Sequence, residues 1–255
     1  MTKLFILQVI ISFFVGGVAI ALLSFIAEKS SKKIAGIILS LPSTVVVSFI
    51  FISWTNSPKV IEYITSVVIT SAAAVLIFSI TFLYLSKIKI KKIYSILLCF
   101  VGSVVTWLLI SIPFAYIKLD NLFLAISIYT TAILITYYFL TVKNTDTQEI
   151  KTLQYTVTQK IGRGIFAGAI IALSVFLSKI INPFWGGIFS GFPATFTSTF
   201  IILHWYYGTD MLFKIGKTVA IGSIVYTSFI LASHWTFPAF DIIGGTIASY
   251  SVSII

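Results

Sequence analysis

The chain has 255 residues, of which 58% are hydrophobic and 9% are charged, and its formal net charge is +10. Soluble domains carry about 25% charged residues, so this chain could not cover a surface that faces water. The basic residues stand in short clusters between apolar runs, without a basic domain or an aromatic-interleaved patch, which excludes nucleic acid as a partner. The composition predicts an integral membrane protein whose main partner is the lipid bilayer.

Nine apolar segments follow one another along the chain, most of them near the roughly 17–25 residues that a membrane-spanning helix needs. They cover about residues 4–27, 35–54, 61–86, 93–116, 121–142, 164–181, 184–207, 212–235 and 238–255. The first segment is too long for the core of a signal peptide and has no small-residue cleavage site, so we expect a retained helix. The sixth and seventh segments nearly adjoin, and the ninth is short. The pattern predicts an all-α polytopic membrane protein with about nine transmembrane helices.

The basic residues of the loops give an independent test of this count. If nine helices alternate sides, thirteen Lys and Arg residues fall on one side of the membrane and four on the other. The four are Lys3, Lys59, Lys118 and Lys179. Because an excess of Lys and Arg marks cytoplasmic loops, we expect the N-terminus outside and the C-terminus in the cytoplasm. The polar 143–163 connector is also expected in the cytoplasm, and the membrane is expected to be a bacterial or archaeal plasma membrane.

The chain resembles itself at a shift of 151 residues. Positions 14–55 align with 165–206 without a gap, and twelve of the 42 aligned pairs are identical, among them Gly17/Gly168 and Trp54/Trp205. Five helices separate each position from its counterpart, and because five is odd the two halves must point in opposite directions. We predict two inverted four-helix repeats, 1–117 and 161–255, joined by a linker helix and connector over 118–160. Inverted repeats of this kind recur in secondary transporters.

Pro42 and Pro193 form another identical pair and lie near the middle of two predicted helices. A proline removes one helical hydrogen bond and crowds the carbonyl four residues earlier, here that of Ile38 or Phe189. In a membrane such a break persists only where protein or a water-filled cavity provides new partners. Hydroxyl side chains flank both prolines and predict a solute site near the midplane. Its residues would be Ser40, Pro42, Ser43 and Thr44 in one half, and Ser190, Pro193, Thr195, Thr197, Ser198 and Thr199 in the other.

The glycines beside these prolines have a different interpretation. Small residues allow membrane helices to approach closely, and we assign Gly36, Gly187 and Gly191 to helix packing. Packing is the simpler explanation for any single one of these residues. Two prolines at matched depth are harder to explain by packing alone.

One short motif connects the chain with a known family. Ile34-Ala35-Gly36 is followed by Pro42, and in this respect the chain resembles the GlpM family of small four-helix inner-membrane proteins, in which an Ile-Ala-Gly segment precedes Phe-Pro-Thr at the same spacing. The second half keeps Gly187 and Pro193 at that spacing, with Trp185-Gly186 in place of Ile-Ala. The resemblance implies two such units fused in opposite orientation. It implies no reaction and no substrate.

No residue pattern points to an enzyme. All seven acidic residues fall in loops or at predicted helix ends, so none of them marks a proton or cation pathway inside the bilayer. His204 and His234 are expected near the membrane interfaces, and Cys99 stands alone as a packed residue. The sequence shows no metal-ligand spacing and no phosphate-binding loop. We expect no catalytic residue, no metal and no cofactor.

Two functions remain open at this point. The first is a transporter or permease that moves a small neutral or weakly polar solute, or a lipid-like molecule, between the second and seventh helices. The second is a non-transporting structural or partner-binding membrane subunit in which the glycines serve packing only. A homo-oligomer is compatible with both.

Overall fold

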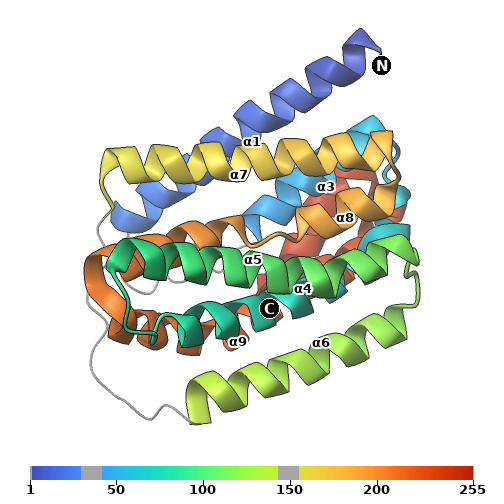
Figure 1. Cartoon of the computed structure of the whole chain (residues 1–255). Coiled ribbons are helices and arrows are strands. Elements are labelled where there is room, and N and C mark those ends of the chain that lie inside the picture. Colours follow the sequence, from blue (N-terminus) through green and yellow to red (C-terminus); the bar gives the residue numbers. More distant parts are fainter. Residues whose placement is uncertain (1, 30–41, 143–154, 255) are drawn as a thin grey trace.

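The computed structural model describes residues 2–29, 42–142 and 155–254, and within these ranges the chain forms helices and no strand. The helices are α1 (Lys3–Lys29), α3 (Ser43–Thr55), α4 (Val60–Leu85), α5 (Lys92–Tyr116), α6 (Leu122–Tyr137), the π-helical turn η1 (Tyr138–Val142), α7 (Val157–Ile180), α8 (Pro183–Ser190) and α9 (Ala194–Ile254). Figure 1 shows them as a bundle, with α1 running obliquely past α7. The prediction of an all-helical protein is therefore confirmed for the described residues.

Seven stretches of the described residues are long and apolar enough to cross a membrane. They comprise residues 3–26, 60–85, 92–116, 122–142, 157–180, 183–216 and 218–253. This finding indicates an integral membrane protein, but it does not confirm the expected count of nine. The difference has two sources: α3 has 13 residues, and the last three predicted segments run together in α8 and α9.

The long helix α9 is bent sharply at two residues. Gly208 has φ 78° and ψ −174°, and Asp241 has φ 58° and ψ −169°, so neither is helical. After Asp241 the chain folds back on itself, because Ser233 Oγ donates to Ser249 Oγ at 3.0 Å and Thr236 Oγ1 donates to the Gly245 carbonyl at 3.1 Å. The helical piece that follows, 242–254, would extend about 20 Å at 1.5 Å per residue. It is therefore shorter than the roughly 30 Å hydrocarbon core of a bilayer.

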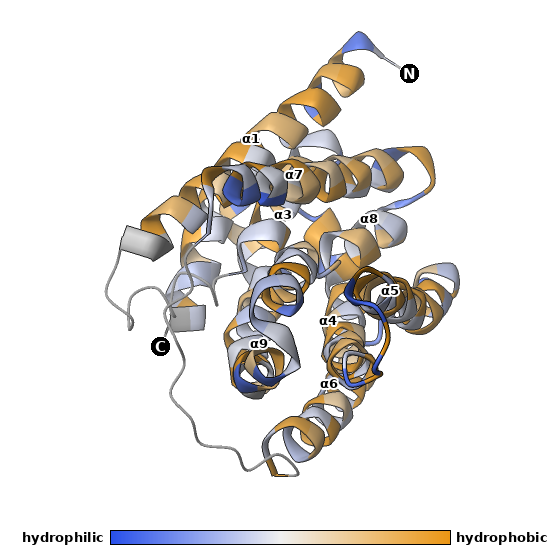
Figure 2. Cartoon of the chain, turned by 60° about the vertical axis from the view of Figure 1, so that its left-hand side comes forward, coloured by the Kyte–Doolittle hydropathy of each residue, from blue (hydrophilic) through white to orange (hydrophobic). Residues whose placement is uncertain are grey.

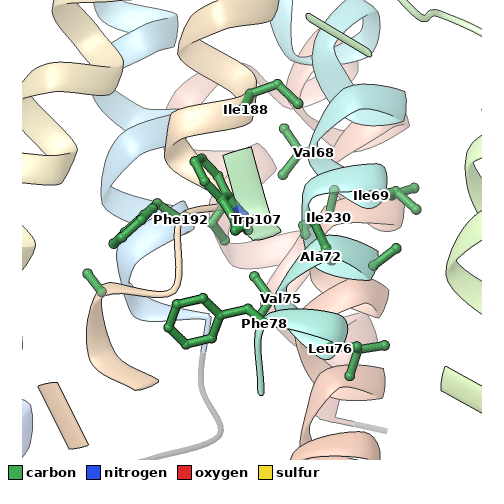
Figure 3. Packing of buried hydrophobic residues seen from close by; sticks show 14 of the residues in the cluster. Val68, Ile69, Ala72, Val75, Leu76, Phe78, Trp107, Ile188, Phe192 and Ile230 are labelled. Atoms are coloured by element: carbon green, nitrogen blue, oxygen red, sulfur yellow. The ribbon is translucent and has the colours of Figure 1, made fainter. Parts of the chain in front are cut away.

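Helix α4 occupies the centre of the bundle. It contacts α5, α6, α8 and α9, and its side chains are buried along nearly its whole length. Figure 3 shows Val68, Ala72, Val75 and Phe78 of this helix facing the neighbouring side chains of the core. A helix that is apolar on every side is stable in such a position, because no face of it has to meet water.

The outer helices expose large apolar side chains. Leu109 is 71% exposed on α5, Phe123 82% on α6 and Ile243 77% near the end of the chain. Figure 2 shows orange, hydrophobic residues along α5 and α6. Apolar surface of this extent is stable when lipid covers it, which agrees with the prediction from composition.

Helix α1 crosses α7 at a pair of glycines near the middle of both helices. A Cβ atom added to Gly168 would lie 3.2 Å from the Gly17 Cα atom and 2.5 Å from the Phe13 carbonyl oxygen. A Cβ atom added to Gly164 would lie 2.6 Å from the Gly17 carbonyl oxygen. The two backbones are thus in direct contact, which only residues without a side chain permit.

The loops gather at two opposite ends of the bundle. At one end the turn after α4 meets the bend at Gly208, because Thr209 Oγ1 donates to the Ser86 carbonyl at 2.9 Å and Lys87 Nζ lies 4.2 Å from the centre of the Phe213 ring. At the other end Lys179 Nζ donates to the Thr55 carbonyl at 3.0 Å. Figure 1 shows the start of α7 at the first of these ends and the connection from α5 to α6 at the second.

Candidate site at the interrupted helix

A break of three residues separates α8 from α9. Helix α8 begins at Pro183, whose missing N–H is not needed in a first turn, and the Asn182 side chain accepts the Phe184 N–H at 3.0 Å. It ends at Ser190, and Gly191, Phe192 and Pro193 are not helical before α9 begins at Ala194. Pro193 has no N–H to continue the helical pattern. The sequence prediction of an interruption at Pro193 agrees with this backbone.

Pro42 has the same position relative to the helix that follows it. It directly precedes α3, and its carbonyl accepts the Val46 N–H at 2.9 Å, just as the Pro193 carbonyl accepts the Thr197 N–H at 2.8 Å. Both prolines therefore stand directly before the first residue of a helix, and their carbonyls accept the first helical hydrogen bond. The chain before Pro42, with Gly36, Ile38 and Ser40, lies outside the described residues. The break expected at Pro42 and the packing role expected for Gly36 therefore stay predictions.

The carbonyls at the break are satisfied by the chain itself and by α4. The Phe189 carbonyl, which we expected to lose its partner, accepts the Phe192 N–H at 3.1 Å. The Ile188 carbonyl accepts the Gly191 N–H at 3.1 Å and also the hydroxyl of Ser71, at 3.1 Å. Gly191 is needed for this approach, since an added Cβ atom would lie 2.5 Å from Ser71 Oγ. The assignment of Gly191 to packing is consistent with this contact, as is that of Gly187, where a Cβ atom would lie 3.0 Å from Val67 Cγ2.

The nominated hydroxyls differ in how they are used. Ser190 donates to the Gly187 carbonyl at 2.7 Å, Ser198 donates to the Ala194 carbonyl at 3.0 Å, and Thr199 donates to the Thr195 carbonyl at 2.7 Å. Each of these bonds stays within one helix, a common arrangement for Ser and Thr. Thr197 is different, because its Oγ1 atom is fully buried and finds no hydrogen-bond partner among the described residues.

The two groups of nominated residues belong to helices that touch. Helix α3, which carries Ser43 and Thr44, contacts both α8 and α9. Thr44 is buried, and Ser43 and Thr195 are half-buried. Among the described residues, no hydrogen bond joins a nominated hydroxyl of one group to one of the other.

Helix α5 contributes three polar residues that the sequence analysis missed. Ser103, Trp107 and Ser111 are fully buried, and among the described residues nothing forms a hydrogen bond with Ser103 Oγ, Trp107 Nε1 or Ser111 Oγ. The Trp107 ring contacts the residues around the break, with ring centroids 5.6 Å from Phe189 and 4.9 Å from Phe192 (Figure 3). A spacing of four residues in the sequence could have identified this buried face of the helix. It comprises Ser95, Cys99, Ser103, Trp107, Ser111 and Ala115.

The break lies at mid-depth in the bundle. Ser71 stands near the middle of α4, and Trp107 stands near the middle of α5. Both touch the segment from Ile188 to Phe192. Hydroxyls, an indole N–H and aromatic rings surround this segment, so the chemistry it offers is hydrogen bonding without charge. Among the described residues no three metal-ligating side chains come together.

The two histidines were both expected near the interfaces. His204 is buried and its Nε2 atom lies 2.8 Å from Ser95 Oγ, so it packs between α9 and α5. His234 Nδ1 lies 3.1 Å from the Glu62 carbonyl oxygen at the start of α4, near the end of the bundle. Cys99 is buried, in agreement with a packing role.

A family model described as "Protein of unknown function (DUF3147)" matches residues 9–119 and 160–240. The chain belongs to this family. No curated protein and no solved structure matches the chain. Membership of this family assigns no activity to the chain. It also does not confirm the resemblance to the GlpM family.

Proposed function

We propose that this protein is an integral membrane transporter or permease for a small uncharged solute, with its site at the break between α8 and α9. The observation that carries the proposal is a non-helical segment at mid-depth, Gly191 to Pro193, enclosed by protein rather than by lipid. Interrupted helices at this depth are a recurrent feature of transporter sites.

The polar atoms around the break support an uncharged solute. Thr197 Oγ1 and Trp107 Nε1 are buried without partners, and a buried polar group in this state costs about 1–3 kcal/mol. A solute with a hydroxyl or carbonyl group could supply the hydrogen-bond partner that each of these atoms lacks. We assign Ser43 and Thr44 of α3 to the same site, and the contacts of α3 with α8 and α9 support this assignment.

The inverted-repeat architecture is part of the same proposal. Gly17 and Gly168 are equivalent at a shift of 151 residues, and they meet each other where α1 crosses α7. An added Cβ at Gly168 would meet the Phe13 carbonyl, and one at Gly17 would lie 3.0 Å from the Gly164 carbonyl, which is the equivalent contact from the other half. Equivalent residues touch in this way when a pseudo-twofold axis passes between them.

Two further observations favour the repeat. The matched family segments begin at residues 9 and 160, and 160 − 9 = 151, the shift found in the sequence. The bends at Gly208 and Asp241 divide α9 into three pieces, which fits nine crossing or partly crossing segments. The repeats would be two GlpM-like units, 1–117 and 161–255, with 118–160 as the linker.

The orientation follows from the charges. The end of the bundle that holds Lys87, Lys92 and the start of α7 would face the cytoplasm of a bacterial or archaeal cell, and the N-terminus would lie outside. Modification of an added cysteine at either end of α6 in whole cells would test this orientation.

A cysteine-accessibility scan tests the site without knowledge of the solute. Thr44→Cys, Thr195→Cys and Ser198→Cys are placed singly in a Cys99→Ala background, with Ser79→Cys as the matched control, since Ser79 is fully buried and its hydroxyl is bonded to Val75. A small water-soluble thiol reagent is expected to label the three site positions and to spare position 79. Protection of all three in every condition tested would count against a water-accessible site.

A flux assay tests transport itself. Proteoliposomes are loaded with uncharged probes such as glycerol, and flux is compared between the wild type and a Pro42→Ala/Pro193→Ala variant that still folds. We expect flux to fall in the variant, because a continuous helix removes the non-helical segment. Equal flux in both would argue strongly against the site.

The second candidate function is a non-transporting structural or partner-binding subunit. It is favoured by one observation: Ser190, Ser198 and Thr199 bond within their own helices, which leaves their hydroxyls engaged. The accessibility scan separates the two functions, because a packing role predicts protection at all three cysteines.

A further inference from the structure

The start of α7 holds a buried arginine, and the described part of the chain supplies no hydrogen-bonded counter-charge to it. Arg163 is 4% exposed, and its Nε and Nη1 atoms have no hydrogen-bond partner. Its guanidinium lies 4.7 Å from the centre of the Tyr155 ring, so a cation–π contact is its main interaction on that side. A cation–π contact returns only a small part of the free energy that burying an ion costs.

A second cation lies on the same face of the helix. Lys160 is 5% exposed, and its Nζ atom lies 4.4 Å from the centre of the Phe25 ring of α1. Lys160 and Arg163 are three residues apart, so both point to the buried side of α7 with Gly164 and Ala167. Two like charges at this spacing on one helix face repel each other, and together they make this face of α7 strongly positive.

Two neutral donors complete the cluster. Tyr155 Oη is buried and has no hydrogen-bond partner in the part of the chain that the structure describes. The first turn of α7 adds the partial positive charge of a helix N-terminus, where the Thr156 side chain accepts the Gln159 N–H at 3.3 Å. A guanidinium, an ammonium group, a phenol and a helix N-terminus all favour the same kind of ligand, an oxyanion.

We propose that Arg163, Lys160 and Tyr155 form a binding site for a phosphate-bearing anion at this end of the bundle. The guanidinium would donate through Nε and Nη1, the tyrosine hydroxyl would donate to a further oxygen, and Lys160 would add charge. The anion is either a phospholipid headgroup or free phosphate. The exposed apolar residues beside the cluster favour a lipid: Leu22 and Ile26 of α1 and Ile161 and Ile165 of α7 are each at least 50% exposed and could contact acyl chains.

The experiment uses the full chain in lipid nanodiscs made of phosphatidylcholine and phosphatidylglycerol. Native mass spectrometry measures how much of each lipid stays bound to the wild type, Arg163→Gln, Arg163→Lys and the control Lys89→Gln. Lys89 carries the same charge in an exposed loop at the same end, so its variant controls for net charge. In a second arm, inorganic phosphate is added to neutral nanodiscs and the shift in Tm is recorded.

The expected result is retention of phosphatidylglycerol by the wild type and Lys89→Gln, and at least about tenfold weaker retention in Arg163→Gln. Arg163→Lys should be intermediate, because an ammonium group cannot make the paired contacts of a guanidinium. A phosphate-dependent rise in Tm that needs Arg163, without lipid selectivity, would assign the site to free phosphate.

Equal lipid retention in the wild type and Arg163→Gln, together with no phosphate effect on Tm, would overturn the proposal and indicate that another part of the chain neutralises Arg163. If Arg163→Gln does not fold, Tyr155→Phe and Arg163→Lys decide the question, since both keep the positive charge. Unchanged binding in both of these variants would also overturn it.

Discussion

Gly17 and Gly168 touch through their backbones where α1 crosses α7. The space between the two helices at this point is so small that a Cβ atom on Gly168 would lie 2.5 Å from the Phe13 carbonyl oxygen. In a membrane, where lipid is as apolar as the helix surfaces, close contact of this kind holds helices together by van der Waals packing. The crossing is therefore a sensitive position for mutation.

Gly168→Ala should lower the free energy of unfolding in detergent by about 1–3 kcal/mol, because one of the two backbones must move. The matched control is Gly162→Ala on the same helix, where an added Cβ atom meets nothing within 4 Å. The control should be neutral or stabilising by less than about 1 kcal/mol. Equal effects at the two positions would show that the crossing is looser than described.

Gly191→Ala should destabilise the break through Ser71. The new methyl group would lie 2.5 Å from Ser71 Oγ and 2.7 Å from Ser71 Cβ, so it displaces the hydroxyl that donates to the Ile188 carbonyl. In a Ser71→Gly background the same substitution should cost at least about 1 kcal/mol less, since the obstructing atoms are gone. A double-mutant cycle from unfolding curves measures this coupling. Additive effects would contradict the contact.

Substitutions at the two bends of α9 should change the stability of the protein in opposite directions. Gly208 (φ 78°, ψ −174°) and Asp241 (φ 58°, ψ −169°) occupy a backbone region that is accessible almost only to glycine. Gly208→Ala should lower stability by about 1–3 kcal/mol although its surroundings are open, whereas Asp241→Gly should raise it by about 1 kcal/mol. Thermal unfolding of both variants measures this difference. The same sign for both would contradict the bend geometry.

Thr197→Val separates packing from transport. Thr197 Oγ1 is buried without a partner, and valine has the same shape, so the substitution should raise the free energy of unfolding by about 1 kcal/mol. If the hydroxyl meets the solute, flux should fall at the same time. The matched control is Ser190→Ala, which removes a hydroxyl bonded to Gly187 and should lower stability by about 1 kcal/mol. A stabilised variant with full flux would remove Thr197 from the site.

The sequence predicted the membrane class, an all-helical chain and the interruption at Pro193, because each depends on local chemistry. Hydropathy decides which segments enter lipid, and a proline removes one helical hydrogen bond, which interrupts the helix at Pro193 but not at Pro113 of α5 or Pro238 of α9. The length of the last apolar segment did not predict the bounds of the last helix correctly. The segment 238–255 was drawn across a bend at Asp241 that its composition does not reveal.

The residues that contact the break between α8 and α9 could not be predicted from the sequence. From the sequence we named only hydroxyls next to the prolines, but Ser71 of α4 donates to the Ile188 carbonyl, and Trp107 of α5 packs against Phe192. These residues lie more than eighty positions from the break along the chain, and their placement depends on how α4 and α5 pack around α8. Local hydrogen bonds within a helix compete with long-range ones, and only the packed bundle decides which form.

The sequence by itself therefore determined which parts of the chain are apolar, helical and interrupted, since hydropathy and proline act over a few residues. The tertiary structure alone decided which polar atoms are left without partners, from Thr197 and Trp107 at the break to Arg163 at the start of α7. Burial is a property of packed helices rather than of a segment, and so the cost of an unpaired polar group arises only when the bundle has formed.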